Sequence, residues 1–390
     1  MQAERLTNHH PLTTHHSAIH RLSLEAFRNY DRLVLDIAPA PVVLVGENGA
    51  GKTSLLEALS LLNPGRGLRG ATLSELQNHL LPATPWAVSA QIDGRRGAAQ
   101  IGVGADPEAP RESRTLRIDG KAGKSSSALL EHLAVLWITP DMDRLLSESM
   151  SERRRFMDRL VFVLNPQHRA RVSRYEEAMR QRLRLLREGP ADAAWLNALE
   201  DQMAKEGIAI AAARKDWCER LSRHLPANPA PFPLLHVHVE GVAESLMENH
   251  SALDAEEALR ARFKQSRGED AASGTTECGP HRSDLRSFHG GTGLTANLCS
   301  SGEQKALLIS LILAQARLLQ SLQGMVPLLL LDDITAHLDE ARREALGHHL
   351  LDMGAQAWLS GTDAGFFDAL QGHAQFFHID HGYARLMSAS

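Results

Sequence analysis

The stretch that decides the fold is Gly46-Glu47-Asn48-Gly49-Ala50-Gly51-Lys52-Thr53, because it satisfies the pattern G-x-x-x-x-G-K-[ST]. The apolar residues 42–45 before it are typical of a buried strand, and residues 53–59 after it have the spacing of an amphipathic helix. A strand, a glycine-rich loop and a helix in this order predict a loop that cradles phosphates. A plain glycine-rich turn is the alternative, and the flanking strand and helix count against it.

In such a loop the backbone N–H groups turn inward around a β-phosphate at the positive end of the following helix. Lys52 is predicted to reach the β- and γ-phosphates and to act in catalysis, and Thr53 is predicted to ligate Mg²⁺. The predicted nucleotide-binding residues are Gly46, Glu47, Asn48, Gly49, Ala50, Gly51, Lys52, Thr53 and Ser54. The loop therefore predicts a bound nucleotide with Mg²⁺, and alone it could belong to a kinase, a GTPase, a helicase or a transporter subunit.

A second apolar run, residues 328–331, ends in the paired carboxylates Asp332 and Asp333. Asp332 is predicted to hold Mg²⁺ together with Thr53, and Asp333 to polarise the attacking water as the catalytic acid–base residue. Adjacent residues at a strand end point to opposite faces, so the two carboxylates should have different roles. Such a run alone is weak evidence, and its pairing with the phosphate loop makes it strong.

Residues 300–305 open a long apolar-periodic helix at about 306–319, with Ser301, Gly302, Gln304 and Lys305 at its start. Ser301 could simply cap that helix. However, Ser-Gly-x-Gln before a helix, then the carboxylate strand, then residues 334–339 ending in Asp339, resembles the order of signature, Walker B and D-loop in ABC-type ATPases. That resemblance implies that the signature of one subunit touches the γ-phosphate held by another, in an ATP-dependent homodimer.

The whole set of motifs resembles the RecF family of bacterial recombination mediators, over about residues 19–365. The segments that carry the resemblance, besides the phosphate loop and residues 301–305 and 331–333, are residues 22–30, 153–158 and 279–285. The fold class that it implies is an α/β P-loop NTPase, an ABC/SMC-like ATPase head with an inserted helical lobe that contains a short antiparallel coiled-coil-like arm. No histidine stands near residues 358–363, where transporter ATPases carry a switch histidine, and Thr362 or Asp363 could replace it.

The family resemblance also implies a function in DNA replication and gap repair, linked to the SOS response. The expected activity is a weak DNA-dependent ATPase that dimerises on double-stranded, gapped or junction DNA when it binds ATP and is released by slow hydrolysis. The expected partners are RecR and RecO, which help to load RecA. Two other classes stay open: a transporter ATPase subunit, and an anti-phage ATPase of the overcoming-lysogenisation type.

Composition favours an ordinary globular protein, with 43% hydrophobic and 23% charged residues and a formal net charge of −5. No uninterrupted apolar run reaches the eighteen or so residues of a membrane span, and residues 1–20 lack the apolar core of a signal peptide, so we expect a cytoplasmic protein without a membrane partner. The three cysteines are far apart, which argues against disulfides or a zinc site.

Positive charge is concentrated in residues 151–188, which hold eleven arginines, no lysine and five acidic residues. Because arginine binds phosphates bidentately and stacks on bases, this segment is a candidate DNA-binding surface. A solvated helix face bridged by acidic partners explains the pattern equally well. The tentative DNA-binding residues are Arg153, Arg154, Arg155, Arg169, Arg171 and Arg174.

The predicted organisation is a flexible leader at 1–17, an ATPase lobe from 18–130 and 276–390, and a helical lobe at 131–275. The leader contains two His-His pairs without helical periodicity. Strands are expected near 19–27, 32–37, 86–92, 98–103, 114–118 and 133–138. The arm consists of two helices between 167 and 221, interrupted at 189–190, and residues 267–274 are expected to form a polar loop.

Overall fold

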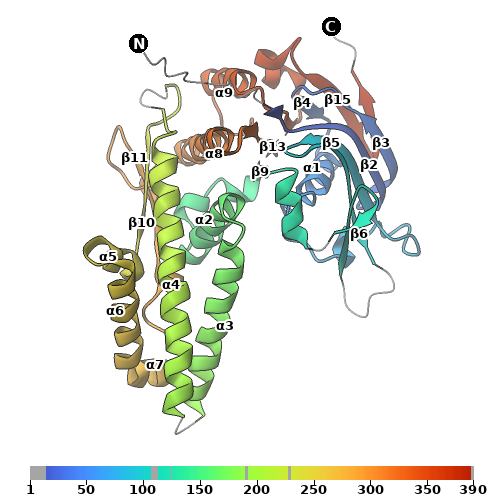
Figure 1. Ribbon diagram of the computed structural model, residues 1–390. Coiled ribbons are helices and arrows are strands. Elements are labelled where there is room, and N and C mark those ends of the chain that lie inside the picture. The colour runs from blue at the N-terminus through green and yellow to red at the C-terminus, as the bar shows by residue number, and fades with distance from the viewer. Residues whose placement is uncertain (1–14, 107–112, 124, 189–191, 227–229, 388–390) are drawn as a thin grey trace, which may run out of the picture. The chain divides into compact units, whose positions relative to one another are not determined.

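The computed structural model describes residues 15–106, 113–123, 125–188, 192–226 and 230–387 (Figure 1). The chain divides into two compact units, each made of separate segments. The sheet unit comprises residues 1–137, 316–334 and 343–390, and the helical unit comprises residues 138–315 and 335–342.

A mixed six-stranded sheet carries the phosphate loop, in the strand order β16-β15-β4-β14-β13-β9. Its central strand β4 pairs in parallel with both β14 and β15. All four residues of β4 and of β13 are buried, because helices and loops cover both faces of a sheet that contains parallel strands. The strands are β4 (Val42–Val45), β9 (Val135–Ile138), β13 (Leu328–Leu331), β14 (Ala357–Gly361), β15 (Gln375–Asp380) and β16 (Tyr383–Leu386).

A second six-stranded sheet in the same unit has the order β3-β2-β5-β6-β7-β8 and is antiparallel throughout. The alternating burial along β2 and β5 confirms the half-buried strands that the sequence predicts. Its strands are β2 (Ala18–Phe27), β3 (Tyr30–Asp36), β5 (Ala87–Gly94), β6 (Gly97–Ala105), β7 (Arg114–Ile118) and β8 (Lys121–Ala122).

The predicted flexible leader is wrong for its last three residues. His15–His16 form strand β1, which pairs in parallel with β12 (Met325–Val326), and Ser17 is buried. Backbone pairing with β12 therefore orders this part of the chain. The first of the two His-His pairs, His9 and His10, lies outside the described residues.

The helical unit contains the predicted arm, because α3 (His168–Arg187) and α4 (Ala193–Ser222) pack side by side (Figure 1). The turn predicted at 189–190 lies outside the described residues. Tyr175 of α3, Met203 of α4 and Phe263 of α6 share one buried core. The other elements are α2 (Met150–Leu164), α5 (Val242–Asn249), α6 (Ala252–Gln265), α7 (Arg267–Ser273), β10 (Leu235–Glu240) and β11 (Asp284–His289).

The polar loop predicted at 267–274 is wrong, because residues 267–273 form helix α7. Its residue Asp270 is fully buried and accepts a 2.6 Å bond from Nη1 of Arg182 and a 2.7 Å bond from Ser266 Oγ. Buried polar anchors of this kind are invisible to hydrophobic periodicity, which reads such a segment as a loop.

The compact units also differ from the predicted lobes. Residues 276–315 belong to the helical unit, because β11 pairs with β10 over six residue pairs and Trp217 Nε1 donates to Gln315 at 2.8 Å. Residues 131–137 belong to the sheet unit, because β9 joins the sheet of β13.

Helix α8 (Ser301–Gln323) passes from one unit to the other along the chain, since residues 301–315 belong to the helical unit and 316–323 to the sheet unit. It is long and apolar enough to cross a membrane by length and composition alone, although the sequence contains no uninterrupted apolar run of that length. Because 72% of the apolar 18-residue stretch within α8 is buried inside the protein, α8 has the environment of a core helix. The remaining helices are α1 (Lys52–Ser60), α9 (Glu340–Asp352) and the 3₁₀ turns η1 (Ser74–Leu76), η2 (Ser126–Glu131), η3 (Pro140–Met142), η4 (Leu145–Ser147), η5 (Pro280–Arg282), η6 (Ala296–Leu298) and η7 (Ala364–Leu370).

Candidate nucleotide site

The predicted phosphate loop connects β4 directly to α1, as the motif requires. Gly49 and Gly51 have φ values of 85° and 118°, in the region that favours glycine. A Cβ atom on Gly46 would lie 2.3 Å from the carbonyl oxygen of Ile379, and one on Gly51 would lie 2.7 Å from Tyr30 Oη. The loop therefore needs glycine at these positions in order to adopt its shape.

Lys52 begins α1 and its side chain folds back over the loop. Its Nζ donates hydrogen bonds to the carbonyl oxygens of Gly46 and Glu47 at 2.6 and 2.8 Å. Burial lowers the pKa of Lys52, and the charges of Asp333 and Asp332 act in the opposite direction. A buried ammonium whose bonds go to neutral carbonyls is suited to receive phosphate oxygens.

Two neighbouring side chains support the loop from β3 and the turn before it, and sequence reasoning gave them no role. Tyr30 Oη donates to the carbonyl oxygen of Gly51 at 3.1 Å, and Asn29 Nδ2 donates to that of Ala50 at 3.3 Å. Both residues lie in the 22–30 segment that carries the family resemblance, which is the one signal that could have found them.

A buried ion pair fixes α1 behind the loop. Arg28 donates two 2.8 Å bonds, from Nε and Nη2, to the two carboxylate oxygens of Glu57 on α1. Glu57 is fully buried, and Arg69 Nη1 lies 3.7 Å from its Oε2. Because bidentate arginine–carboxylate pairs restrict orientation, this contact sets the direction of α1 relative to β2.

Asp332 and Thr53 are 279 residues apart in the chain, and Thr53 Oγ1 donates to Asp332 Oδ1 at 3.0 Å. Burial raises the pKa of Asp332, although the hydrogen bonds from Ser360 and Thr53 oppose this shift. A hydroxyl and a carboxylate side by side are hard oxygen ligands of the kind that Mg²⁺ takes. The raised pKa indicates a buried negative charge that a divalent cation would compensate, so the two residues fit the predicted metal.

The geometry at Asp333 differs from the expected strand end. Strand β13 ends at Leu331, and residues 332–337 form a turn in which Asp333 has a φ of 45°. Strand alternation therefore does not set the directions of the two carboxylates. This left-handed conformation costs an ordinary residue energy, and such strain often accompanies functional sites.

Ser360 on β14 joins both carboxylate residues and was missed from the sequence. Its Oγ donates to Asp332 Oδ1 at 2.7 Å and accepts a 2.8 Å bond from the backbone N–H of Asp333. The two residues suggested for the switch position behave differently. Thr362 is exposed, and Asp363 accepts a bond from the N–H of Gly365 at the start of η7.

At the predicted signature, the structure shows that Ser301 is not the cap of α8. Ser300 Oγ accepts from the N–H of Glu303, while Glu303 Oε2 accepts from the N–H of Ser300, which is a capping box. Ser301 lies one position inside the helix and is exposed. Its hydroxyl is thus not needed to cap the helix.

The other signature residues hold the helix start in place. Gln304 accepts a 2.9 Å bond from Ser147 Oγ, and Nζ of the buried Lys305 lies 3.3 Å from Asp143. Gly302 is half-buried at the start of the helix. Among the D-loop residues, Asp339 is exposed and its Oδ1 accepts from the N–H of Arg342, so it caps α9.

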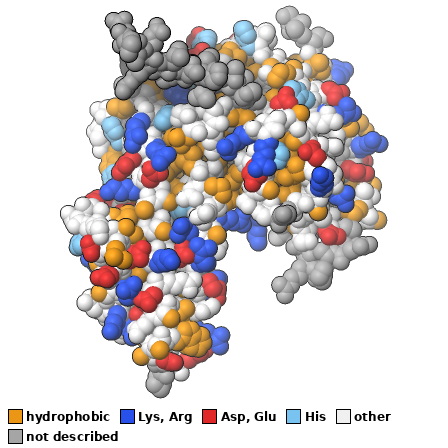
Figure 2. Space-filling view, viewed as in Figure 1, with side chains coloured by type: hydrophobic (Ala, Val, Ile, Leu, Met, Phe, Trp, Pro, Cys, Tyr) orange, Lys and Arg blue, Asp and Glu red, His pale blue; other side chains and the backbone are white. Residues whose placement is uncertain are grey.

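The candidate DNA-binding arginines fall into two groups. Arg153, Arg171 and Arg174 are paired with carboxylates of the same unit, Arg153 with Asp284 and the other two with Glu206. Arg155 is also paired with a carboxylate, Glu152, and is 72% exposed, whereas Arg154 donates to the carbonyl oxygen of Ser283 and Arg169 lies over the ring of Phe162. On the face drawn in Figure 2, blue and red side chains are intermixed over the helical unit, without a broad single-sign patch.

Comparisons with known proteins agree with this geometry. A family model described as the RecF/RecN/SMC N terminal domain matches residues 18–380. A protein of Mesorhizobium japonicum named DNA replication and repair protein RecF is 45% identical over 95% of this chain and 98% of its own length. Its namesake from Brucella suis biovar 1 is 46% identical over 94% of this chain and 95% of its own.

Solved structures show the same fold. A structure described as the recombination mediator protein RecF with ATP has a TM-score of 0.82 at 22% identity, over 95% of this chain and 99% of that one. An Smc head domain from Pyrococcus furiosus has a TM-score of 0.55 at 16% identity, over 96% of both chains. The predicted ABC/SMC-like ATPase fold is confirmed, and the chain belongs to the RecF/RecN/SMC N-terminal domain family, with curated relatives named RecF.

Proposed function

We propose that this protein binds ATP and Mg²⁺ and uses them to control its binding to DNA during replication and gap repair. The observation that carries the proposal is the 3.0 Å contact between Thr53 and Asp332, which joins the phosphate loop to the acidic turn. The names of the curated relatives support the biological role.

Nucleotide binding is assigned to the loop and its first helical turn. Lys52 would exchange its two carbonyl partners for phosphate oxygens, while the N–H groups at the start of α1 face the same charge. Thr53 and Asp332 would hold Mg²⁺, which supplies charge neutralisation between the phosphates when it is bound. Asn29 and Tyr30 would keep the loop in a shape that needs no rearrangement.

Hydrolysis is assigned to Asp333, which would orient and polarise the attacking water. Ser301 and Gly302 of one copy would approach the γ-phosphate held by another, so that ATP drives formation of a homodimer. This assignment is supported by the exposure of Ser301 and by its release from capping. Slow hydrolysis would then dissolve the dimer.

The proposed ligands are double-stranded and gapped DNA, and the proposed protein partners are RecR and RecO, with RecA loading as the outcome. A weak DNA-dependent ATPase activity, a link to the SOS response and a cytoplasmic location belong to the same proposal. What supports them is the 45% identity to relatives named DNA replication and repair protein RecF. Of the arginines suggested for DNA, those without a described carboxylate partner, Arg154 and Arg169, are the stronger candidates.

The first test is Lys52→Ala. Loss of the ammonium should abolish ATP binding, ATP-dependent dimerisation and ATP-dependent DNA binding together, because all three depend on the same loop. Lys121→Ala, in the exposed strand β8, is the matched control and should behave like the wild type. Fluorescent ATP titration and light scattering with and without DNA measure these effects. Equal dimerisation of the Lys52→Ala protein in ATP would refute the assignment.

The two alternative classes make different predictions in solution. A transporter subunit should co-sediment with liposomes that carry its membrane partner rather than with duplex DNA. An anti-phage nuclease of the overcoming-lysogenisation type should nick DNA in a metal-dependent manner. We expect co-sedimentation with DNA and no nicking.

A further inference from the structure

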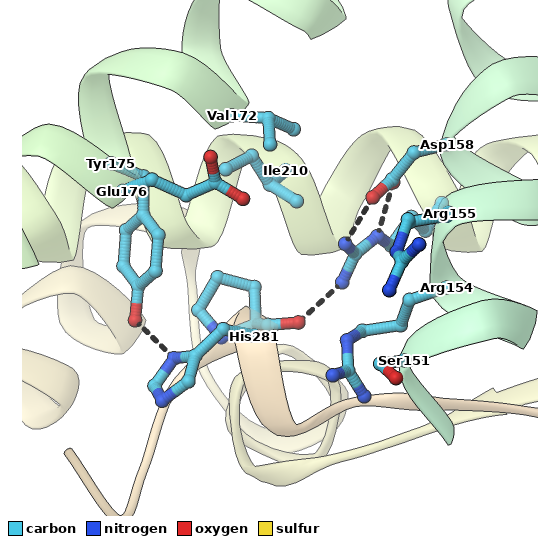
Figure 3. A pocket seen from close by; sticks show the side chains of 11 residues that line it. Ser151, Arg154, Arg155, Asp158, Val172, Tyr175, Glu176, Ile210 and His281 are labelled. Atoms are coloured by element: carbon cyan, nitrogen blue, oxygen red, sulfur yellow. Dashed lines mark hydrogen bonds and ion pairs between the residues drawn. The ribbon is translucent and has the colours of Figure 1, made fainter. Parts of the chain in front are cut away.

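A pocket of about 160 Å³ opens in the helical unit, and none of the residues that line it is assigned to ATP (Figure 3). Helices α2, α3 and α4 and the turn η5 supply its walls. Arg154, Arg155 and Ser151 come from α2, with Glu176 on the α3 side and Arg214 on α4. The volume is several times that of one water molecule, so a tetrahedral anion fits.

Hydrogen bonds hold the back wall of the pocket in place, and the positive charge of Arg214 is balanced by Asp158. Arg214 donates two 2.8 Å bonds to the carboxylate of Asp158 and a 2.6 Å bond to the carbonyl oxygen of Pro280. Tyr175 Oη and His281 Nδ1 are 2.7 Å apart, and His281 Nε2 lies 2.8 Å from the carbonyl oxygen of Thr276. Burial lowers the pKa of His281 to about 4, so the ring is neutral at pH 7 and adds no positive charge.

Arg154 is the exception to this balance. Its Nη1 donates to the neutral carbonyl oxygen of Ser283 at 2.8 Å, and in the part of the chain that the structure describes no carboxylate oxygen lies within 4 Å of its guanidinium. Its sequence neighbour Arg153 instead makes two 2.7 Å bonds to Asp284. Burial, followed by the charge of Arg214, lowers the pKa of Arg154, while the charges of Asp158 and Asp284 act in the opposite direction without reversing the shift.

Arg154 and Arg155 lie on the same side of the pocket as Ser151 (Figure 3). A guanidinium has five donors in a planar fork, so Arg154 keeps donors for a second acceptor after its bond to Ser283. Phosphate oxygens match that fork bidentately, and the serine hydroxyl adds a further donor. The negative charge of Glu176, which also lines the pocket, would repel a bound anion. Removal of that charge should therefore strengthen anion binding.

We propose that this pocket binds a single phosphate group of DNA, with Arg154 as the principal ligand and Arg155 and Ser151 at its side. The proposal deepens the DNA-binding function proposed above and rests on it for the source of the phosphate. It gives Arg154 a direct contact with DNA, in contrast to Arg153, whose fork is already used by Asp284.

The main experiment compares DNA affinity across a salt series for the wild type, Arg154→Gln and the control Arg184→Gln. Arg184 lies on α3 outside the pocket, is 77% exposed and pairs with Glu188. Arg154→Gln should weaken binding about ten-fold or more and reduce the slope of log K against log [salt] by about 0.9, the value for one phosphate contact. Arg184→Gln should change neither quantity measurably. An unchanged slope for Arg154→Gln would overturn the proposal while DNA binding by the wild type stands.

A second pair of variants tests the sign of the effect. Glu176→Gln removes the negative charge that lines the pocket and should strengthen DNA binding, whereas Glu177→Gln removes the same charge one residue away, outside the pocket lining. A purely structural role for the pocket would not raise affinity. Equal effects of the two substitutions would count against the pocket.

A third arm separates free phosphate from DNA phosphate. Inorganic phosphate is titrated by ³¹P NMR into the Lys52→Ala protein, with and without Arg154→Gln. If phosphate binds and Arg154→Gln removes that binding, the pocket is an anion site. If the wild type then fails to bind DNA, the ligand is free phosphate and the proposed DNA contact is overturned. Absence of both DNA and phosphate effects refutes the pocket altogether. If Arg154→Gln does not fold, Arg155→Gln at the exposed edge carries the same test, and an unchanged slope there overturns the proposal.

Discussion

At the residue scale, the two carboxylates of the acidic turn are in different surroundings. Asp332 is buried against Thr53 and Ser360, whereas Asp333 is half-buried and has a left-handed φ of 45°. Their separate roles were predicted from strand alternation, but the structure places both after the end of β13. Separate roles are therefore supported by the difference in burial and in hydrogen-bond partners, and not by strand alternation.

This difference predicts opposite nucleotide phenotypes. Asp332→Asn should weaken Mg·ATP binding at least about ten-fold, because a neutral amide loses the charge that the cation needs. Asp333→Asn should keep ATP affinity, suppress hydrolysis and trap a long-lived dimer on DNA. ATP titration and single-turnover hydrolysis measure the two effects. Indistinguishable variants would contradict the division of roles.

The raised pKa of Asp332 gives a prediction for the protein without ATP. At low pH the carboxyl is protonated in both the folded and the unfolded state. As pH rises, the unfolded state ionises first, so the free energy of unfolding falls until pH exceeds the raised native pKa. Asp332→Asn removes this loss, and the variant should be at least as stable as the wild type at pH 7, with the advantage shrinking toward pH 4. Urea unfolding of both proteins between pH 4 and 8 measures the difference in their free energies of unfolding. If the variant loses stability relative to the wild type as pH rises from 4 to 7, the argument from burial is wrong.

At the scale of elements, a buried polar network joins three helices of the helical unit. Arg182 of α3 is fully buried and donates to Glu200 of α4 at 2.8 Å and to Asp270 of α7 at 2.6 Å, while Arg267 also donates to Glu200. This network anchors α7, the segment that the sequence pattern predicts as a loop. The buried carboxylates and arginines of this network neutralise one another, so the removal of one of them leaves an unpaired buried charge.

We therefore expect Arg182→Met to destabilise the helical unit by about 3–5 kcal/mol, since the buried Asp270 would lose its cation and Glu200 would keep only Arg267. Arg184→Met, two residues along the same helix and 77% exposed, is the matched control and should have no measurable effect. Urea unfolding followed by circular dichroism gives the comparison. A small effect of Arg182→Met would mean that Glu200 and Asp270 find other partners.

At the scale of the whole molecule, the proposed dimer depends on the exposed start of helix α8, where the signature residues lie. Ser301 is exposed, and the capping of α8 belongs to Ser300 and Glu303. Ser301→Arg should therefore leave ATP binding by the monomer intact, yet block dimer formation and hydrolysis through bulk and charge. Ser273→Arg, an exposed serine at the end of α7, controls for the added charge. Light scattering and ATP titration separate the two steps, and loss of ATP binding in Ser301→Arg would point to a structural role.

The sequence alone determined the features that depend on local pattern. The glycines at 46, 49 and 51, the apolar run of β4 and the helix that follows specify a phosphate loop, because backbone conformation and periodicity are properties of neighbouring residues. The antiparallel strands and the two helices of the arm were predicted for the same reason. The motif order also indicates the family, because it is a property of the sequence alone.

Only the tertiary structure decided which distant side chains meet. Ser360 lies beside Asp332, Tyr30 beneath Gly51 and Arg28 against Glu57, and each contact is made by residues that no local pattern relates. The same holds for the arginines, because the sequence cannot distinguish Arg153, paired with Asp284, from Arg154, which lines a pocket beside a neutral carbonyl. Charge compensation inside a fold is a long-range property, since it depends on which acid the chain brings within a few ångströms of each base.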